Sequence, residues 1–320
     1  MAVFVLSQYA EIDNIKKFDI MKIQDLFQHL TKGADDMKKI KKKYIFGILA
    51  VVLLAMVLSK FIFKTEVDLS GYLAFDTNAD NGMFVYNFST EELESLKTDE
   101  LVTISNVTGY NPENNSYYCV GRRTTDGYFV MKVSSGRITD SWHLPKEPTQ
   151  IKAIGNTVII IFKDSVLSLN TADGNISVQL ENVKINKIVT YENSFVLWME
   201  DYHYTGKIEN DRVIIDNPVQ HVSSLRVADF VDLNTLLTYM FEYETNCYYY
   251  DLQTNKLSET GYDIDRTYPV VINGDNILCL YETNYADETK WYNYQVSKNK
   301  LTRIKTDGVM LAARYVEWVG

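Results

Sequence analysis

Residues 236–257 read LLTYMFEYETNCYYYDLQTNKL, and this stretch contains the unit that decides the fold. An apolar run begins at Leu236. Further along, residues 249–257 place a polar turn with Asn and Lys between two apolar stretches. Short apolar runs separated by such turns are typical of antiparallel β-hairpins. No 3.6-residue periodicity accompanies them, so the stretch predicts strands rather than helices.

Both halves of this unit recur along the chain at a common period. The apolar run is found six times, at intervals of 45, 41, 37, 41 and 41 residues, beginning at Tyr72, Tyr117, Val158, Phe195, Leu236 and Ile277. The hairpin pattern is also found six times, at intervals of 45, 36, 39, 44 and 44 residues, anchored at Phe88, Val133, Leu169, Ile208, Leu252 and Val296. Two separate markers therefore indicate a repeat of about 41 residues.

A repeat of this length, built from short strands, is typical of a β-propeller blade. An isolated four-stranded blade cannot bury both faces, whereas a closed ring packs each blade against two neighbours. Inner strands are expected ahead of five of the markers, at Val102–Ile104, Ile151–Ile154, Ile185–Val189, Leu225–Ala228 and Pro269–Ile272. The first blade has no such strand. We expect Val309–Val316 to supply it and to close the ring.

The sequence thus predicts an all-β, six-bladed β-propeller over residues 64–320, with the repeat around Ile208 as its least regular blade. Residues 65–320 resemble six-bladed propellers of the TolB-like and YVTN-like type in architecture, without a motif diagnostic of one family. This resemblance implies a binding platform, a scaffold or, in some members, an enzyme, because function is carried by sites added to a fold.

A membrane segment is expected ahead of the repeats. Tyr44–Phe63 reads YIFGILAVVLLAMVLSKFIF, and twenty residues at about 1.5 Å rise match the hydrocarbon core of a bilayer. Five lysines precede it in Met37–Lys43. By the positive-inside rule, residues 37–63 form a basic flank and a signal-anchor helix, with a cytoplasmic N-terminus and an extracytoplasmic propeller. Cleavage of this segment as a signal peptide is the alternative.

Residues 1–36 form a cytoplasmic segment in this arrangement. Apolar residues recur in it at near-helical spacing, at Ile12, Ile15, Ile20, Ile23, Leu26, Phe27 and Leu30. The pattern predicts an amphipathic helix that docks on a cytoplasmic partner or on the membrane surface. An upstream extension without such a role is the other interpretation.

Net charge limits the partners that are expected, and the sequence around each cysteine indicates its state. Residues 65–320 contain 21 basic and 36 acidic side chains, and an acidic domain repels phosphate backbones, so nucleic-acid binding is not expected. The three cysteines Cys119, Cys247 and Cys279 lie in strand-like apolar runs. They are expected to be buried free thiols, with one disulfide and a leftover thiol as the alternative.

The sequence has no signature of a nucleophile elbow, a zinc protease, a P-loop or a dinucleotide fold, and no catalytic residue is assigned. Asp76, Asn78 and Asp80 alternate like the start of a calcium loop, although the glycine falls one place late and no Glu stands at the twelfth position. They are candidate calcium ligands, and a solvated hairpin tip explains the same residues. No other cofactor is expected.

The function expected from these features is a non-catalytic binding, scaffold or sensor module of a bacterial cell envelope, whose ligand is an extracytoplasmic protein or glycan. Acid pairs at Glu200–Asp201 and at Asp263 and Asp265 leave open a membrane-anchored glycan hydrolase or lyase with carboxylates at the channel mouth. A transmembrane signalling regulator that acts through residues 1–36 is the third candidate.

Overall fold

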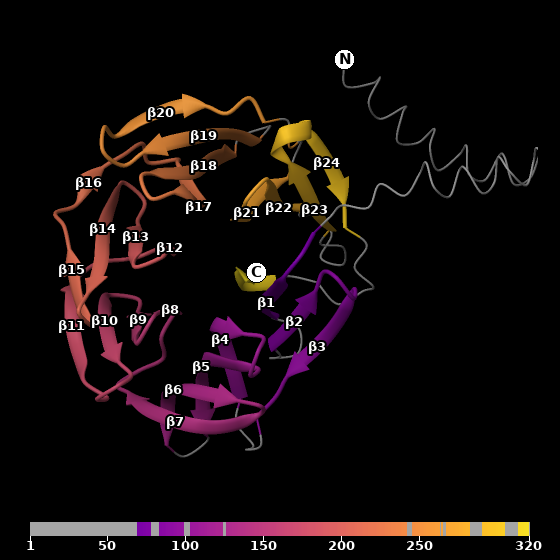
Figure 1. The fold of residues 1–320 in the computed structure, drawn as a ribbon. Coiled ribbons are helices and arrows are strands. Elements are labelled where there is room, and N and C mark those ends of the chain that lie inside the picture. Colours follow the sequence, from indigo (N-terminus) through magenta and orange to yellow (C-terminus); the bar gives the residue numbers. More distant parts are fainter. Residues whose placement is uncertain are drawn as a thin grey trace, which may run out of the picture. The chain divides into compact units, whose positions relative to one another are not determined.

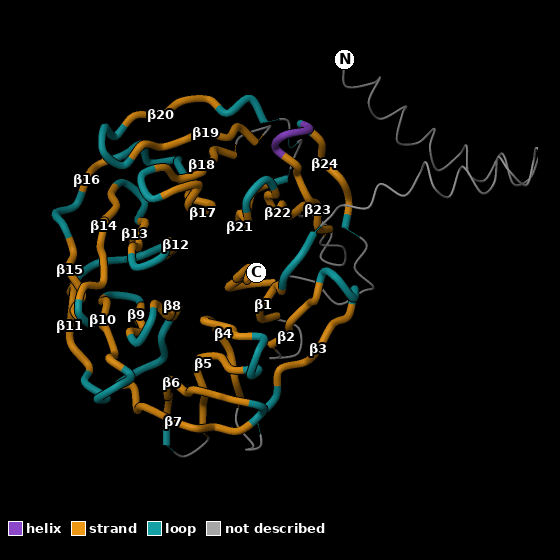
Figure 2. The backbone as a smooth tube through the Cα atoms, viewed as in Figure 1, coloured by secondary structure: helices purple, strands orange, loops and turns teal. Residues whose placement is uncertain are grey.

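The computed structural model describes residues 69–77, 83–98, 103–123, 126–241, 245–262, 264, 267–281, 290–304 and 313–319. Six antiparallel sheets stand around a ring, each with one strand at the centre and the others further out (Figure 1). Within the described residues the strands are joined by turns, and one short 3-10 helix, η2 (Val296–Lys298), breaks the pattern (Figure 2).

The first three blades have four strands each. Blade 1 consists, from the centre outward, of β25 (Ala313–Val319), β1 (Tyr72–Thr77), β2 (Met83–Asn87) and β3 (Glu92–Leu96). Blade 2 consists of β4 (Thr103–Asn111), β5 (Ser116–Arg123), β6 (Gly127–Ser134) and β7 (Arg137–Leu144). Blade 3 consists of β8 (Gln150–Ile154), β9 (Thr157–Ile161), β10 (Ser165–Asn170) and β11 (Ile176–Glu181).

The other three blades repeat this order with one irregularity. Blade 4 consists of β12 (Lys187–Tyr191), β13 (Ser194–Trp198), β14 (Tyr202–Glu209), β15 (Arg212–Ile215) and the short β16 (Val219–Gln220), which also pairs with β14. Blade 5 consists of β17 (Arg226–Asp232), β18 (Thr235–Phe241), β19 (Thr245–Asp251) and β20 (Lys256–Glu259). Blade 6 consists of β21 (Tyr268–Asn273), β22 (Asn276–Tyr281), β23 (Lys290–Gln295) and β24 (Lys300–Arg303).

The core of this fold is divided among the junctions between blades. Among the described residues there are six clusters of buried side chains. Each joins two adjacent blades, and the one around Leu73 and Leu278 joins blade 6 to blade 1. In β9, for example, all five residues are buried, because one face packs on blade 2 and the other on blade 4. A strand buried on both faces reads as a continuous apolar run, which is the marker that recurs in the sequence.

The predicted propeller is confirmed, including its six blades and its closure. The five expected inner strands correspond to β4, β8, β12, β17 and β21, with ends that differ by up to seven residues, as at the end of β4. The closing strand ends at Val319 rather than Val316, and it pairs antiparallel with β1 through Leu73 and Trp318 (Figure 1). The Trp318 indole also donates a hydrogen bond of 2.9 Å to the Ser70 carbonyl. Blade 4 is irregular, as expected.

The predicted N-terminal features lie outside the described residues. This applies to the segment 1–36, to the basic flank and to the helix Tyr44–Phe63, which all stay predictions. In the part of the chain that the structure describes, no helix has the length and apolarity needed to cross a membrane. The three cysteines are free and buried, which confirms the prediction of free thiols.

Candidate binding site in the central channel

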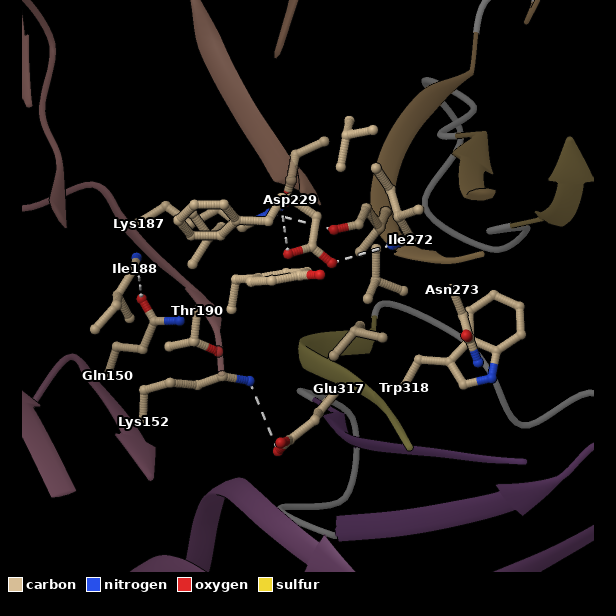
Figure 3. Close-up of a pocket in the computed structure, with 18 of the residues that line it drawn as sticks. Gln150, Lys152, Lys187, Ile188, Thr190, Asp229, Ile272, Asn273, Glu317 and Trp318 are labelled. Atoms are coloured by element: carbon tan, nitrogen blue, oxygen red, sulfur yellow. Dashed lines mark hydrogen bonds and ion pairs between the residues drawn. The ribbon is translucent and has the colours of Figure 1, made fainter. Parts of the chain in front are cut away.

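The centre of the ring contains a cavity of about 750 Å³. All six inner strands contribute to its wall, with Val107 from β4 and larger groups of residues from the other five. A cavity of this size is within the range of small-ligand sites, roughly 300–1,000 Å³. The cavity is therefore the candidate functional site, and Figure 3 shows the side chains that line it.

Bulges in the inner strands turn polar side chains toward this cavity. The register of β17 against β18 shifts between Val227 and Asp229 and again between Phe230 and Asp232. A similar shift occurs in β21 between Pro269 and Val271. A bulge places an extra residue in one strand and changes the direction of its side chain. Asp229 consequently faces the cavity between two buried neighbours, Ala228 and Phe230.

A repeated hydrogen bond links successive inner strands around the ring. At four junctions, a backbone N–H of one strand donates to a side-chain oxygen of the strand before it, with the pairs Gly109 to Glu317 (2.8 Å), Ala153 to Thr108 (3.1 Å), Ile188 to Gln150 (3.3 Å) and Ile272 to Asp229 (3.1 Å). The innermost strand of each blade has an unpaired edge, and buried N–H groups on such an edge need acceptors. These polar side chains therefore link the inner strands at four of the six junctions.

Lys187 links three strands across one side of the cavity. Its ammonium group donates to the Ala228 carbonyl of β17 at 2.5 Å and to the Val270 carbonyl of β21 at 3.3 Å. Burial lowers the pKa of Lys187 to about 8, and the neighbouring Asp229 carboxylate opposes that shift. The Lys187 amine is thus committed to the wall, because two of its N–H groups donate to these carbonyls.

Asp229 is held on the same side by backbone donors. Its Oδ1 accepts from Phe230 N at 2.9 Å and its Oδ2 accepts from Ile272 N at 3.1 Å (Figure 3). Burial raises the pKa of this carboxyl, and the two N–H groups together with Lys187 oppose the shift. Since each oxygen already serves a backbone group, the carboxylate is placed as a structural acceptor.

Lys152 and Glu317 occupy the opposite side. The Lys152 ammonium lies 3.7 Å from the Glu317 carboxylate, beyond the usual length of a hydrogen bond, and the two side chains are 16% and 18% exposed. Figure 3 shows the two groups pointing toward each other. With Lys187 and Asp229, they make a wall with two positive and two negative side chains.

The site residues proposed from the sequence lie away from the cavity or outside the residues that the structure describes. Asp76 is 7% exposed at the end of β1, and its Oδ2 accepts from Asn106 N at 3.1 Å. Asn78 and Asp80 are outside the described residues, so the calcium loop stays a prediction. Glu200 and Asp201 lie in the turn between β13 and β14 and do not line the cavity, while Asp263 and Asp265 are also outside the described residues.

Two histidines that no sequence pattern connects come together in the structure. His203 and His221 are 18 positions apart, yet their rings lie 5.8 Å from each other, and both stack on Trp198. The cavity residues Lys152, Lys187, Asp229 and Glu317 were also missed as site residues. A signal for two of them was available, because Lys152 and Lys187 are charged residues inside apolar inner strands.

No protein-family model matches the sequence, and no curated protein matches it. Solved structures do match. TolB from Acinetobacter baumannii has a TM-score of 0.52 and 11% identity, over 78% of this chain and 67% of TolB. The protein is a six-bladed β-propeller. A YCF48 protein solved with a D1 peptide has a TM-score of 0.48 and 12% identity, over 78% of this chain and 83% of YCF48. At these identities the likeness extends to the fold alone.

Proposed function

We propose that this propeller is a non-catalytic binding or scaffold module, anchored in a bacterial membrane and exposed on its outer side, which takes its ligand in the central channel. The observation that carries the proposal is the wall of the 750 Å³ cavity. Three of its four charged side chains, Lys187, Asp229 and Glu317, already hydrogen-bond to backbone groups. A wall built in this way presents a shaped, rigid polar surface to a ligand.

The same contacts favour binding over hydrolysis. A glycosidase needs one carboxyl that gives up a proton and a second that attacks or activates water. Asp229 accepts two backbone N–H bonds and Glu317 accepts one, from Gly109. These bonds fix both carboxylates in the wall as acceptors, which suits recognition.

The anchor part of the proposal rests on the sequence. Tyr44–Phe63 matches the thickness of a bilayer, and the lysines of Met37–Lys43 favour a cytoplasmic N-terminus. TolB resembles the chain in fold, and this likeness gives no information about the ligand or the cellular location of the chain. The partner class is an extracytoplasmic protein or glycan.

Photo-crosslinking in intact cells tests the channel as the binding site. A benzophenone amino acid at Thr190, which lines the cavity, is expected to capture the ligand and shift the mass of the protein. The control position is Ser95, which is exposed on the outer strand β3. A mass shift at Ser95 with none at Thr190 would place the ligand on the outer surface and contradict the proposal.

A further inference from the structure

The hydrogen-bonding capacity of the cavity is unevenly distributed. On the β17 side, Lys187 and Asp229 are occupied by backbone groups. On the β8 side, the amide nitrogen of Gln150 and the hydroxyl of Thr190 have no hydrogen-bond partner among the described residues. There, Lys152 contacts only the Glu317 carboxylate, at 3.7 Å. The groups left for a ligand are therefore gathered on one side, on β8, β12 and β25 (Figure 3).

These groups include both donors and acceptors, and their charges balance. Lys152 and Gln150 donate, Glu317 accepts with the oxygen that Gly109 does not use, and Thr190 does both. A ligand with a net charge would bring an uncompensated charge into this partly desolvated space, because the four charged lining residues sum to zero. The wall therefore favours an uncharged ligand rich in hydroxyl groups.

Aromatic rings border the same space. Tyr191, Phe230, Tyr268 and Trp318 line the cavity, and the Tyr191 and Phe230 rings lie 5.9 Å apart. Aromatic faces pack well against the apolar C–H faces of pyranose rings, while hydroxyl groups around the ring edge reach polar side chains. A cavity of about 750 Å³ accommodates a ligand of the size of a disaccharide.

We infer that the channel binds a neutral saccharide, with adjacent hydroxyl groups bridging Lys152 and Glu317. One hydroxyl accepts from the Lys152 ammonium and its neighbour donates to Oε1 of Glu317, so the ion pair, which lies at 3.7 Å through Oε2, is kept. A zwitterion such as a dipeptide would have to separate the pair to bind both charges. This inference rests on the proposed function and names the ligand class of its site.

Saturation-transfer NMR on the full-length chain tests the inference. The protein is kept in a polyoxyethylene detergent, since alkyl maltosides would themselves compete for the site. The probes are the neutral disaccharides cellobiose, maltose and N,N′-diacetylchitobiose, compared with digalacturonic acid, the glucosamine dimer and dialanine. We expect signals from at least one neutral disaccharide and weaker or absent signals from the charged compounds.

Two variants assign the signal to the channel. Glu317→Gln keeps an acceptor for Gly109 N–H and removes the charge, while Lys152→Met removes the ammonium group. Loss of a hydrogen bond to a charged group is expected to weaken saccharide binding about tenfold or more. The matched control is Glu209→Gln, which breaks the Lys207–Glu209 pair (2.7 Å) of blade 4, whose side chains are both 52% exposed. It should leave binding unchanged.

Each outcome decides the question. Absence of binding by every neutral disaccharide, stronger binding of a charged probe, or unchanged binding in both variants would overturn the inference. If Glu317→Gln does not fold, Lys152→Met alone decides, because the Lys152 ammonium donates no hydrogen bond and forms no second ion pair within 4 Å among the described residues. Capture at Thr190 in cells without any saccharide binding would leave the binding module standing and remove only the ligand class.

Discussion

His203 is completely buried where blades 4 and 5 meet, and neither ring nitrogen has a hydrogen-bond partner among the described residues. Its ring stacks near Trp198 and His221, and the edge of Tyr250 meets it at nearly a right angle. Burial lowers the pKa of His203 to about 4, and the neighbouring His221 adds to this shift. A neutral imidazole is therefore built into the core of this junction.

The domain should lose stability in weak acid through His203. Between pH 6.5 and about pH 4, the unfolded chain binds a proton at this position and the folded chain does not, so the free energy of unfolding falls as the pH falls. The full effect is about 3 kcal/mol. Urea unfolding across this pH range measures it, and His203→Phe should flatten the slope.

The exposed His143 is the control for this experiment. His143→Phe should leave the pH dependence of unfolding as it is in the parent protein. An equal slope in the parent protein and in His203→Phe would show that other groups cause the acid sensitivity.

At the scale of the element, β25 decides whether the ring is closed. It is the inner strand of blade 1, although it comes from the other end of the domain sequence. Val316 and Trp318 pack against the apolar cluster shared by blades 6 and 1, and Glu317 accepts the Gly109 N–H of blade 2. One strand thus contributes to both junctions of blade 1 and to the wall of the cavity.

Truncation after Asp307 should therefore destabilise the domain. It exposes the edge of β1 and removes apolar contacts worth several kcal/mol, and each kcal/mol lowers the Tm of a domain of this size by about 2–4 °C. We expect a fall in Tm of roughly 10 °C or more, measured by calorimetry. Removal of Gly320 alone is the control, and a Tm unchanged by the longer truncation would refute the role of β25.

At the scale of the whole molecule, the proposed orientation in the membrane can be tested by cysteine labelling, because the native thiols interfere little. Cys119, Cys247 and Cys279 are buried, and burial raises the pKa of each thiol, that of Cys119 and Cys247 to about 12. A thiol of this kind reacts slowly with maleimides. A cysteine introduced on the surface is therefore the main site of labelling in the folded protein.

Ser177→Cys and Ser7→Cys make a matched pair for this test. Ser177 is exposed on β11, and Ser7 belongs to the segment expected in the cytoplasm. A membrane-impermeant maleimide on intact cells should label the cysteine at position 177 at once, and the one at position 7 only after permeabilisation. The reverse order of labelling would contradict the proposed orientation.

The candidate site could be predicted from the sequence only in part. Lys152 and Lys187 are visible as charged residues inside apolar runs, but their partners are 165 and 42 positions away, at Glu317 and Asp229. Sequence spacing says nothing about contacts across the centre of a ring, since these depend on how far each blade is rotated. The pair His203 and His221 has a different cause: the short strand β16 pairs with β14 through Val219 and His203, which brings the following His221 back beside β14.

The sequence by itself determined the repeat, the blade count and the closing strand. It could do so because each blade is a local unit whose strands are buried on both faces, and burial on both faces leaves a periodic apolar pattern in the chain. Only the tertiary structure decided which polar side chains meet in the channel. The bulges of β17 and β21 turn single residues inward, and the ring brings residues from six separate repeats to one axis.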